Sequence, residues 1–281
     1  GNAGMLAELQ DKVTEDQMDL SVFMEYPLKQ NYVGDTLYGI PCYTDSYAIC
    51  YNKAVFDKYG VEYPKEGWNW NDYEALAEEL NSKIKAEGGN EFASALAINE
   101  PAHGTLLLLT CNGAKLYNED VTACALNVPE SVEMLEMVQR MVESGAQADY
   151  DTLVETNAAS LFLSGLAGMI IICPDPGANG LFEGTSVKET LDYIAFPNGP
   201  TSGTNYIDTV TMNNIVINSG TTKFDAAWDF VKWYTTNQEA LDAYAKIEWH
   251  LPTNVNAFDA WEASHDYAEV YVEEADKVVT V

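Results

Sequence analysis

The sequence predicts an α/β protein, because short apolar runs rich in β-branched and aromatic residues alternate with longer segments of helical periodicity. The clearest strand covers residues 47–51, which follow a turn at Gly39 and Pro41 and stop at Asn52. The chain has 281 residues, of which 47% are hydrophobic. It can therefore bury the core of one large domain or of two lobes.

The predicted helices carry start and stop signals. Residues 69–87 begin with a capping-box pattern, Asn69 and Asp72, and a second helix runs from Pro129 to Gly145. We expect further helices at residues 105–111, 158–165, 223–234 and in the tail 258–279, and further strands at residues 92–99, 168–173, 193–197 and 215–218.

The charge of the chain limits its partners. Lys and Arg together number 14 against 44 Asp and Glu, a formal net charge of −30. Such a chain is repelled by nucleic acid and by anionic membrane surfaces, so neither is expected as a partner. The single arginine, Arg140, leaves few of the bidentate donors that phosphate or carboxylate ligands usually need. We therefore expect a neutral or cationic ligand.

Common catalytic and metal-binding motifs are absent from the sequence. It contains no Walker-type glycine-rich loop, no G-x-S-x-G elbow and no H-E-x-x-H pair. The five cysteines form no C-x-x-C pair, and His103, His250 and His265 are far apart in the chain. We expect no enzymatic activity, no cofactor and no metal site.

Several segments, taken in order, resemble one family of binding proteins. They are Gly-Ile-Pro at residues 39–41 with Tyr-Asn-Lys at 51–53, Leu-Phe-Leu-Ser-Gly-Leu-Ala-Gly-Met at 161–169, Ala-Ala-Trp-Asp-Phe-Val-Lys-Trp-Tyr at 226–234, and Leu-Pro-Thr at 251–253. Together they resemble the extracellular solute-binding proteins of carbohydrate ABC importers, the group that contains maltose-binding protein.

This resemblance implies a periplasmic-binding-protein-like fold, with two lobes, hinge crossovers and a ligand cleft between the lobes. The crossovers are expected near residues 44–47, 205–210 and 250–253. The first lobe would comprise residues 1–45 and 209–251, without the N-terminal part that members of the family have. The second lobe would comprise residues 46–208 and 252–281.

The resemblance also implies a function and a location. The chain would capture a sugar or oligosaccharide outside the cell and deliver it to the membrane permease of an ABC importer. It would work as a monomer, either periplasmic or tethered to the membrane as a lipoprotein. Closure about the hinge would present both lobes to the permease together.

The candidate ligand-binding residues are polar or aromatic and lie at the expected crossovers and strand ends. Sugars offer flat C–H faces that stack on aromatic rings and hydroxyl groups that bond to carboxylates and phenols. Trp249 is the best stacking candidate, whereas Trp68 and Trp70, at the start of a helix, are expected mainly to anchor packing. The candidates are Tyr43, Asp45, Glu100, His103, Asp175, Tyr206, Asp208 and Trp249.

Two alternatives stay open from the sequence. A glycan-acting enzyme or accessory module would show a carboxylate pair with a raised pKa. A binding protein for a cationic ligand such as a polyamine would use Asp45, Glu100, Asp175 and Asp208, and its binding would weaken with salt.

Overall fold

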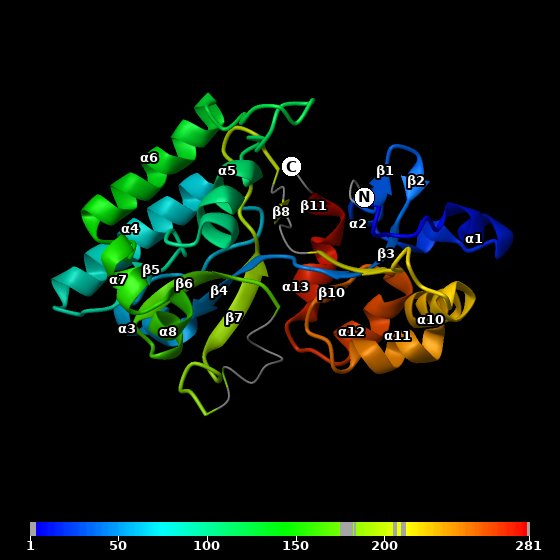
Figure 1. The fold of residues 1–281 in the computed structure, drawn as a ribbon. Coiled ribbons are helices and arrows are strands. Elements are labelled where there is room, and N and C mark those ends of the chain that lie inside the picture. The colour runs from blue at the N-terminus through cyan, green and yellow to red at the C-terminus, as the bar shows by residue number, and fades with distance from the viewer. Residues whose placement is uncertain (1–3, 175–181, 183, 205–206, 209–211, 280–281) are drawn as a thin grey trace. The chain divides into compact units, whose positions relative to one another are not determined.

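The computed structural model describes residues 4–174, 182, 184–204, 207–208 and 212–279. It confirms the α/β class, with helices and sheets distributed along the chain (Figure 1). The chain forms two compact units, which are described separately. Unit 1 comprises residues 1–46 and 211–279, and unit 2 comprises residues 47–210 and 280–281.

Unit 2 is built on a four-stranded sheet in the order β5-β6-β4-β7. The strands are β4 (Ala48–Asn52), β5 (Phe92–Ser94), β6 (Ala167–Ile172) and β7 (Leu191–Ala195). Strand β4 is antiparallel to both of its neighbours, and β5 is parallel to β6. The apolar run predicted from residue 47 is thus a central strand, buried at each position.

Helices cover both faces of this sheet. They are α3 (Lys53–Tyr59), α4 (Trp70–Ala86), a π-helix at Pro101–Leu106, α5 (Leu107–Cys111), α6 (Pro129–Ser144), α7 (Tyr150–Glu155) and α8 (Ala158–Leu163). Unit 2 also contains the short strand β8 (Ile207–Asp208), which is not part of this sheet. Ile49 of β4 belongs to a core cluster with side chains of α3, α4, α5 and α6. Cys50, on the opposite face, belongs to a second cluster with side chains of α7 and α8. This alternation follows from the period of two residues in a strand.

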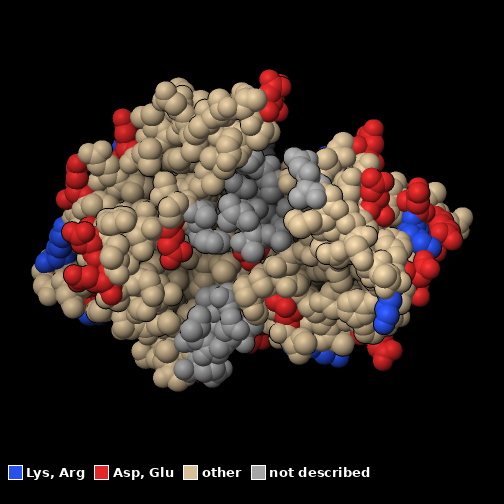
Figure 2. Space-filling model, viewed as in Figure 1, with Lys and Arg blue, Asp and Glu red and all other residues tan. Residues whose placement is uncertain are grey.

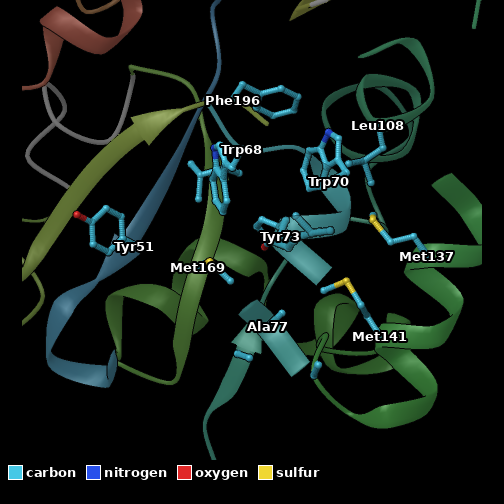
Figure 3. Close-up of a cluster of buried hydrophobic side chains, with 14 of the residues drawn as sticks. Tyr51, Trp68, Trp70, Tyr73, Ala77, Leu108, Met137, Met141, Met169 and Phe196 are labelled. Atoms are coloured by element: carbon cyan, nitrogen blue, oxygen red, sulfur yellow. The ribbon is translucent and has the colours of Figure 1, made fainter. Parts of the chain in front are cut away.

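The first core cluster is rich in aromatic and methionine side chains (Figure 3). Trp70 and Tyr73 of α4 point into it, as do Met137 and Met141 of α6, which runs beside α4. The expected capping box at Asn69 and Asp72 is present at the start of α4. Trp70 is fully buried, so it anchors packing and is closed to a ligand.

Trp68 has the same role as Trp70. It is 6% exposed, and its Nε1 donates a hydrogen bond of 2.8 Å to the carbonyl of Ala195. The expectation that both tryptophans serve packing is therefore confirmed.

Unit 1 has a three-stranded antiparallel sheet in the order β10-β3-β9. Its strands are β3 (Gly39–Thr44), β9 (Met212–Val216) and β10 (Leu251–Pro252), with a separate hairpin of β1 (Tyr32–Val33) and β2 (Thr36–Leu37) and a final strand β11 (Val278–Val279). The helices are α1 (Gln10–Glu15), α2 (Glu25–Lys29), α10 (Phe224–Thr236), α11 (Gln238–Ala245), α12 (Phe258–Glu262) and α13 (Ala268–Glu273), with 3₁₀ turns at Leu20–Val22, Val255–Ala257 and Ala275–Lys277.

The core of unit 1 joins the sheet to helix α10. Ile40 of β3 and Ile217 pack with Trp228 and Val231 of α10 and with Leu9 from the N-terminal segment. The predicted amphipathic helix at 223–234 is thereby confirmed, because its buried positions recur at helical spacing.

The lobe boundaries implied by the resemblance differ from the two units by one or two residues at 46 and 209–210, and by the whole segment 252–279. Residues 252–279, which the resemblance placed in the second lobe, cluster with unit 1. The physical reason is packing within unit 1: α12 contacts α11 and β10, and Trp261 of α12 donates a 2.9 Å hydrogen bond to the carbonyl of Glu248.

Candidate functional site

Two segments of unit 1 that are far apart in sequence meet at the end of strand β3. Strand β10 pairs antiparallel with β3, so that Leu251 faces Thr44 and Pro252 faces Tyr43. The backbone N–H of Thr253 continues the pairing by donating to the carbonyl of Cys42 at 3.1 Å. The residues just after Thr44 therefore lie beside the residues just before Leu251.

His250 occupies the centre of this junction. Its Nε2 lies 3.6 Å from Oδ1 of Asp45, and its Nδ1 is hydrogen-bonded to Oε1 of Glu248. The imidazole is 4.5 Å from the ring of Tyr43, at an angle of 30°, and stacks on the ring of Trp249 with centroids 3.4 Å apart. Three of the predicted site residues, Tyr43, Asp45 and Trp249, thus share one neighbour.

A row of tyrosine side chains extends from Tyr43 of β3 to helices α11 and α10. Tyr43 stacks on Tyr244 at 5.6 Å, and Tyr244 meets Tyr234 edge to face, also at 5.6 Å. A cavity of only about 10 Å³ is left beside Tyr234 and Tyr244. The rings are therefore backed by close packing, which limits their movement.

Burial and charge set the protonation states in the cluster. Burial acts to raise the pKa of Glu248, but hydrogen bonds from the ring and backbone of His250 outweigh it and hold that pKa below its usual value. Burial, together with the nearby charge of Glu248, raises the pKa of Tyr43 and of Tyr244, and burial raises the pKa of Tyr234 to about 12. At neutral pH the site thus combines an ionised carboxylate with phenol groups that keep their protons.

Two buried hydroxyl groups lie next to these residues in the chain. Ser46 follows Asp45 and Thr253 follows β10, and both residues are 0% exposed. Within the described part of the chain, neither hydroxyl oxygen has a hydrogen-bond partner. A buried hydroxyl group without a partner costs free energy, so a hydrogen bond from a ligand to either of these two would be favourable.

The other predicted site residues belong to unit 2 or fall outside the described residues. Glu100 is exposed in unit 2, directly before the π-helix, and His103 lies within that helix, where the side chain is not described. Asp208 ends β8, and its side chain is likewise not described. Asp175 and Tyr206 fall outside the described residues.

Glu248, His250 and Tyr244 are members of the cluster that were not predicted from the sequence. A signal was available for two of them, because Glu248 and His250 flank Trp249 immediately before the Leu-Pro-Thr segment. Tyr244 gave none, since a tyrosine at the end of an amphipathic helix is usually a packing residue.

The described residues contain no group of three or more His, Cys, Asp or Glu arranged to hold a metal ion. Among the described helices, none combines the length and the hydropathy needed to cross a membrane.

Comparison with known proteins identifies relatives along most of the chain. A binding protein of Brucella abortus is 28% identical over 262 residues, which are 90% of this chain and 58% of that protein. The maltotriose-binding protein of Pyrococcus abyssi is 25% identical over 257 residues, 89% of this chain and 51% of that protein. The chain thus spans little more than half the length of these relatives.

Solved structures share the fold at low sequence identity. An ABC substrate-binding protein of Listeria monocytogenes, solved with cycloalternan, has a TM-score of 0.80 and 23% identity, covering 99% of this chain and 70% of that one. The GacH receptor of Streptomyces glaucescens, solved without ligand and with acarbose, has a TM-score of 0.78 and 20% identity. The match covers 100% of this chain and 69% of the receptor. These similarities support the periplasmic-binding-protein-like fold predicted from the sequence. Residues 1–241 match the family described as bacterial extracellular solute-binding protein, and the chain belongs to that family.

Proposed function

We propose that this chain is the ligand-binding component of an ABC importer and captures a neutral sugar or oligosaccharide. The observation that carries the proposal is the cluster of Trp249, Tyr43, Asp45 and Glu248 at the junction of β3 and β10. Relatives and structural neighbours support the ligand class, since they include proteins named for maltotriose or solved with cycloalternan or acarbose.

The chemistry of the cluster suits a sugar. Trp249 is partly exposed and offers an aromatic face for the C–H groups of a pyranose ring. Glu248 and Asp45 accept hydrogen bonds from hydroxyl groups, and the phenol of Tyr43 can donate one. None of these groups supplies positive charge, so an anionic sugar is disfavoured. The acidic side chains spread over the visible face of the molecule, where Lys and Arg are sparse, act in the same direction (Figure 2).

The remaining site residues and the lobe arrangement stay part of the proposal. Glu100, His103, Asp175, Tyr206 and Asp208 are proposed to supply the contacts of the second lobe with the sugar. Hinge closure on the ligand would then be the signal that a membrane permease recognises. We propose that the protein works outside the cell membrane, as a monomer.

Glu248 does not supply the protonated acid that a glycosidase needs. A carboxylate pair in a glycosidase includes one acid with a raised pKa. The pKa of Glu248 is shifted in the opposite direction, because His250 donates to it.

A cationic ligand such as a polyamine is the second candidate. The observation in its favour is that two carboxylates, Asp45 and Glu248, lie within reach of one imidazole and several aromatic rings. Aromatic rings and carboxylates also bind ammonium groups. Salt separates the two ligand classes, since screening weakens only the binding of the charged ligand.

The proposal is tested by a thermal-shift and calorimetry screen against monosaccharides, oligosaccharides and polyamines. A ligand that binds only the native state raises the melting temperature. We expect an oligosaccharide to bind and Trp249→Ala to weaken it at least about 10-fold, the equivalent of about 1.4 kcal/mol. The matched control is Trp233→Ala, because Trp233 is 51% exposed in unit 1 and its ring lies against Phe230, which is not a member of the cluster.

The outcomes separate the possibilities. Equal loss of binding in Trp249→Ala and Trp233→Ala would contradict the assignment of the site. If this chain binds nothing, the screen is repeated on a protein as long as the relatives. Failure of that folded, longer protein to bind any sugar would overturn the proposed function.

A further inference from the structure

His250 touches more of the candidate site than any residue selected from the sequence. Its side chain is only 12% exposed, although it lies between two residues that are proposed to meet the ligand. Its ring contacts Trp249 at 3.4 Å, with an interplanar angle of 22°, and Tyr43 at 4.5 Å. The imidazole is therefore the support against which both rings rest.

The imidazole is itself held by two chain segments. The Nδ1 side is bonded to Glu248, and the Nε2 side faces Asp45, at the end of β3, across 3.6 Å. Both carboxylates are shielded, with side-chain exposures of 18% for Glu248 and 7% for Asp45. The hydrogen bond to the shielded Glu248 orients the ring more strongly than a bond to an exposed carboxylate would, whereas the approach of Asp45, at 3.6 Å, is longer than a hydrogen bond.

The backbone of this segment is fixed as well. Oε1 of Glu248 accepts from the backbone N–H of Trp249 at 3.2 Å and of His250 at 3.3 Å. Trp261 of α12 donates to the carbonyl of Glu248 at 2.9 Å. The segment that carries the imidazole is thus fixed by α12 and by hydrogen bonds within the segment itself.

We infer that His250 is a positioning residue, which fixes the ring planes of Trp249 and Tyr43 in the unliganded protein and so preorganises the site for a sugar. This inference rests on the proposed function for its ligand, although the positioning itself can be measured without one. Ordering a rotamer-rich side chain on binding costs free energy, and a residue ordered beforehand avoids that cost. The ligand would meet Trp249, while His250 acts through it.

The test uses two variants that remove different properties of the imidazole. His250→Phe keeps an aromatic ring and removes both nitrogens, whereas His250→Gln keeps a hydrogen-bonding group and removes the ring. The control is His265→Phe, because His265 also lies against a tryptophan, Trp261, at 5.4 Å, and its Nδ1 is 2.9 Å from the carbonyl of Trp261.

The direct readout is the near-ultraviolet circular dichroism of Trp249. It is obtained by subtracting the spectrum of a Trp249→Phe protein from that of its parent, first with His250 and then in each variant background. A ring held in one orientation gives a strong band, and a ring that samples several rotamers gives a weak one. We expect the band to shrink in both His250 variants and to keep its size in His265→Phe.

The second readout is the dissociation constant of the oligosaccharide found in the screen. We expect each His250 variant to bind it about 10-fold more weakly, the cost of ordering one large side chain on binding. An unchanged Trp249 band in both His250 variants would overturn the inference, whatever happens to affinity. Should His250→Phe fail to fold, His250→Gln alone decides by the same criterion.

The two proposals can fail separately. If the band shrinks but no sugar binds, the positioning role stands and the proposed function fails. If a sugar binds with the affinity of the native protein while the band is unchanged, the proposed function stands and the positioning role fails.

Discussion

Replacing Glu248 by glutamine tests the electrostatics of the candidate site. The substitution keeps the acceptor oxygen and the shape of the side chain but removes the charge. Oε1 of Glu248 accepts hydrogen bonds from the ring of His250 and from two backbone N–H groups at 3.2 and 3.3 Å. A hydrogen bond to a charged group contributes about 1.5–3 kcal/mol, against about 0.5–1.5 kcal/mol for a neutral one. Since two of the three bonds are long, we expect Glu248→Gln to lower the free energy of unfolding by about 1–2 kcal/mol at neutral pH.

The loss of stability in Glu248→Gln should be larger at neutral pH than at acidic pH. The pKa of Glu248 is lowered in the folded protein, because the hydrogen bonds from His250 outweigh the effect of burial. A carboxyl of this kind stabilises the fold fully above its unfolded pKa, about 4.3 for glutamate. It loses that contribution as the pH falls through the folded pKa. The difference between native protein and variant should therefore be complete at neutral pH and shrink below about pH 4.

The assay is urea unfolding at neutral pH and at several values down to about pH 3, with the free energy obtained by linear extrapolation. Glu25→Gln is the control, since Glu25 is 72% exposed in its ion pair with Lys29, and it should change stability little at any pH. A stability difference for Glu248→Gln that is the same at all pH values, or absent at neutral pH, would refute the reasoning.

Two further predictions concern the core of unit 2 and the ligand. The side chain of Gln147 is buried, at 1% exposed. Its amide oxygen accepts hydrogen bonds from Ser94 Oγ at 2.7 Å and from the backbone N–H of Leu96 at 2.8 Å. Its amide nitrogen donates hydrogen bonds to the backbone carbonyls of Leu96 at 3.0 Å and of Ala148 at 2.8 Å. Each partner left unpaired costs about 1–3 kcal/mol, so Gln147→Leu should lower the free energy of urea unfolding by about 3 kcal/mol or more. The control Gln139→Leu, at an exposed residue, should leave the free energy of unfolding nearly unchanged. A loss below about 1 kcal/mol for Gln147→Leu would contradict the role given to the Gln147 amide. For the ligand, we expect calorimetry to give a dissociation constant that changes less than about two-fold between about 0.05 and 0.5 M salt, because a neutral sugar is not screened. A steep rise with salt would instead identify a cationic ligand.

The sequence predicted elements best where local signals agreed. The strand starting at residue 47 is present and buried as its pattern predicts. The helix from Pro129 is also present, but it buries Met134, Met137 and Met141, while Val132 and Leu135 of its apolar pattern are 47% and 48% exposed. Residues 92–99, by contrast, form a strand only as far as Ser94. Beyond it, the side chain of Gln147 bonds to both the N–H and the carbonyl of Leu96, in place of a neighbouring strand. A side chain about 50 positions away cannot be inferred from local propensity.

The helix expected at 105–111 shows the same limit. Only Leu107–Cys111 is α-helical, and the preceding turn, Pro101–Leu106, is a π-helix. Gly104 lies so close to the backbone of Ala97 that an added Cβ would be 1.9 Å from its carbonyl oxygen. This approach between backbone segments depends on tertiary packing, which the apolar pattern of the sequence does not reveal.

The candidate site depends on strand register more than on any single residue in it. Strand β3 has an irregularity between Pro41 and Tyr43, after which Tyr43 and Thr44 pair with Pro252 and Leu251. A shift of one residue would turn the Tyr43 side chain to the opposite face of the sheet and separate it from His250. Pro252 fits this place because β10 is an edge strand, where a residue without a backbone donor is tolerated. The Leu-Pro-Thr segment at 251–253 therefore fixes the geometry of the site, while the chemistry comes from the residues just before it.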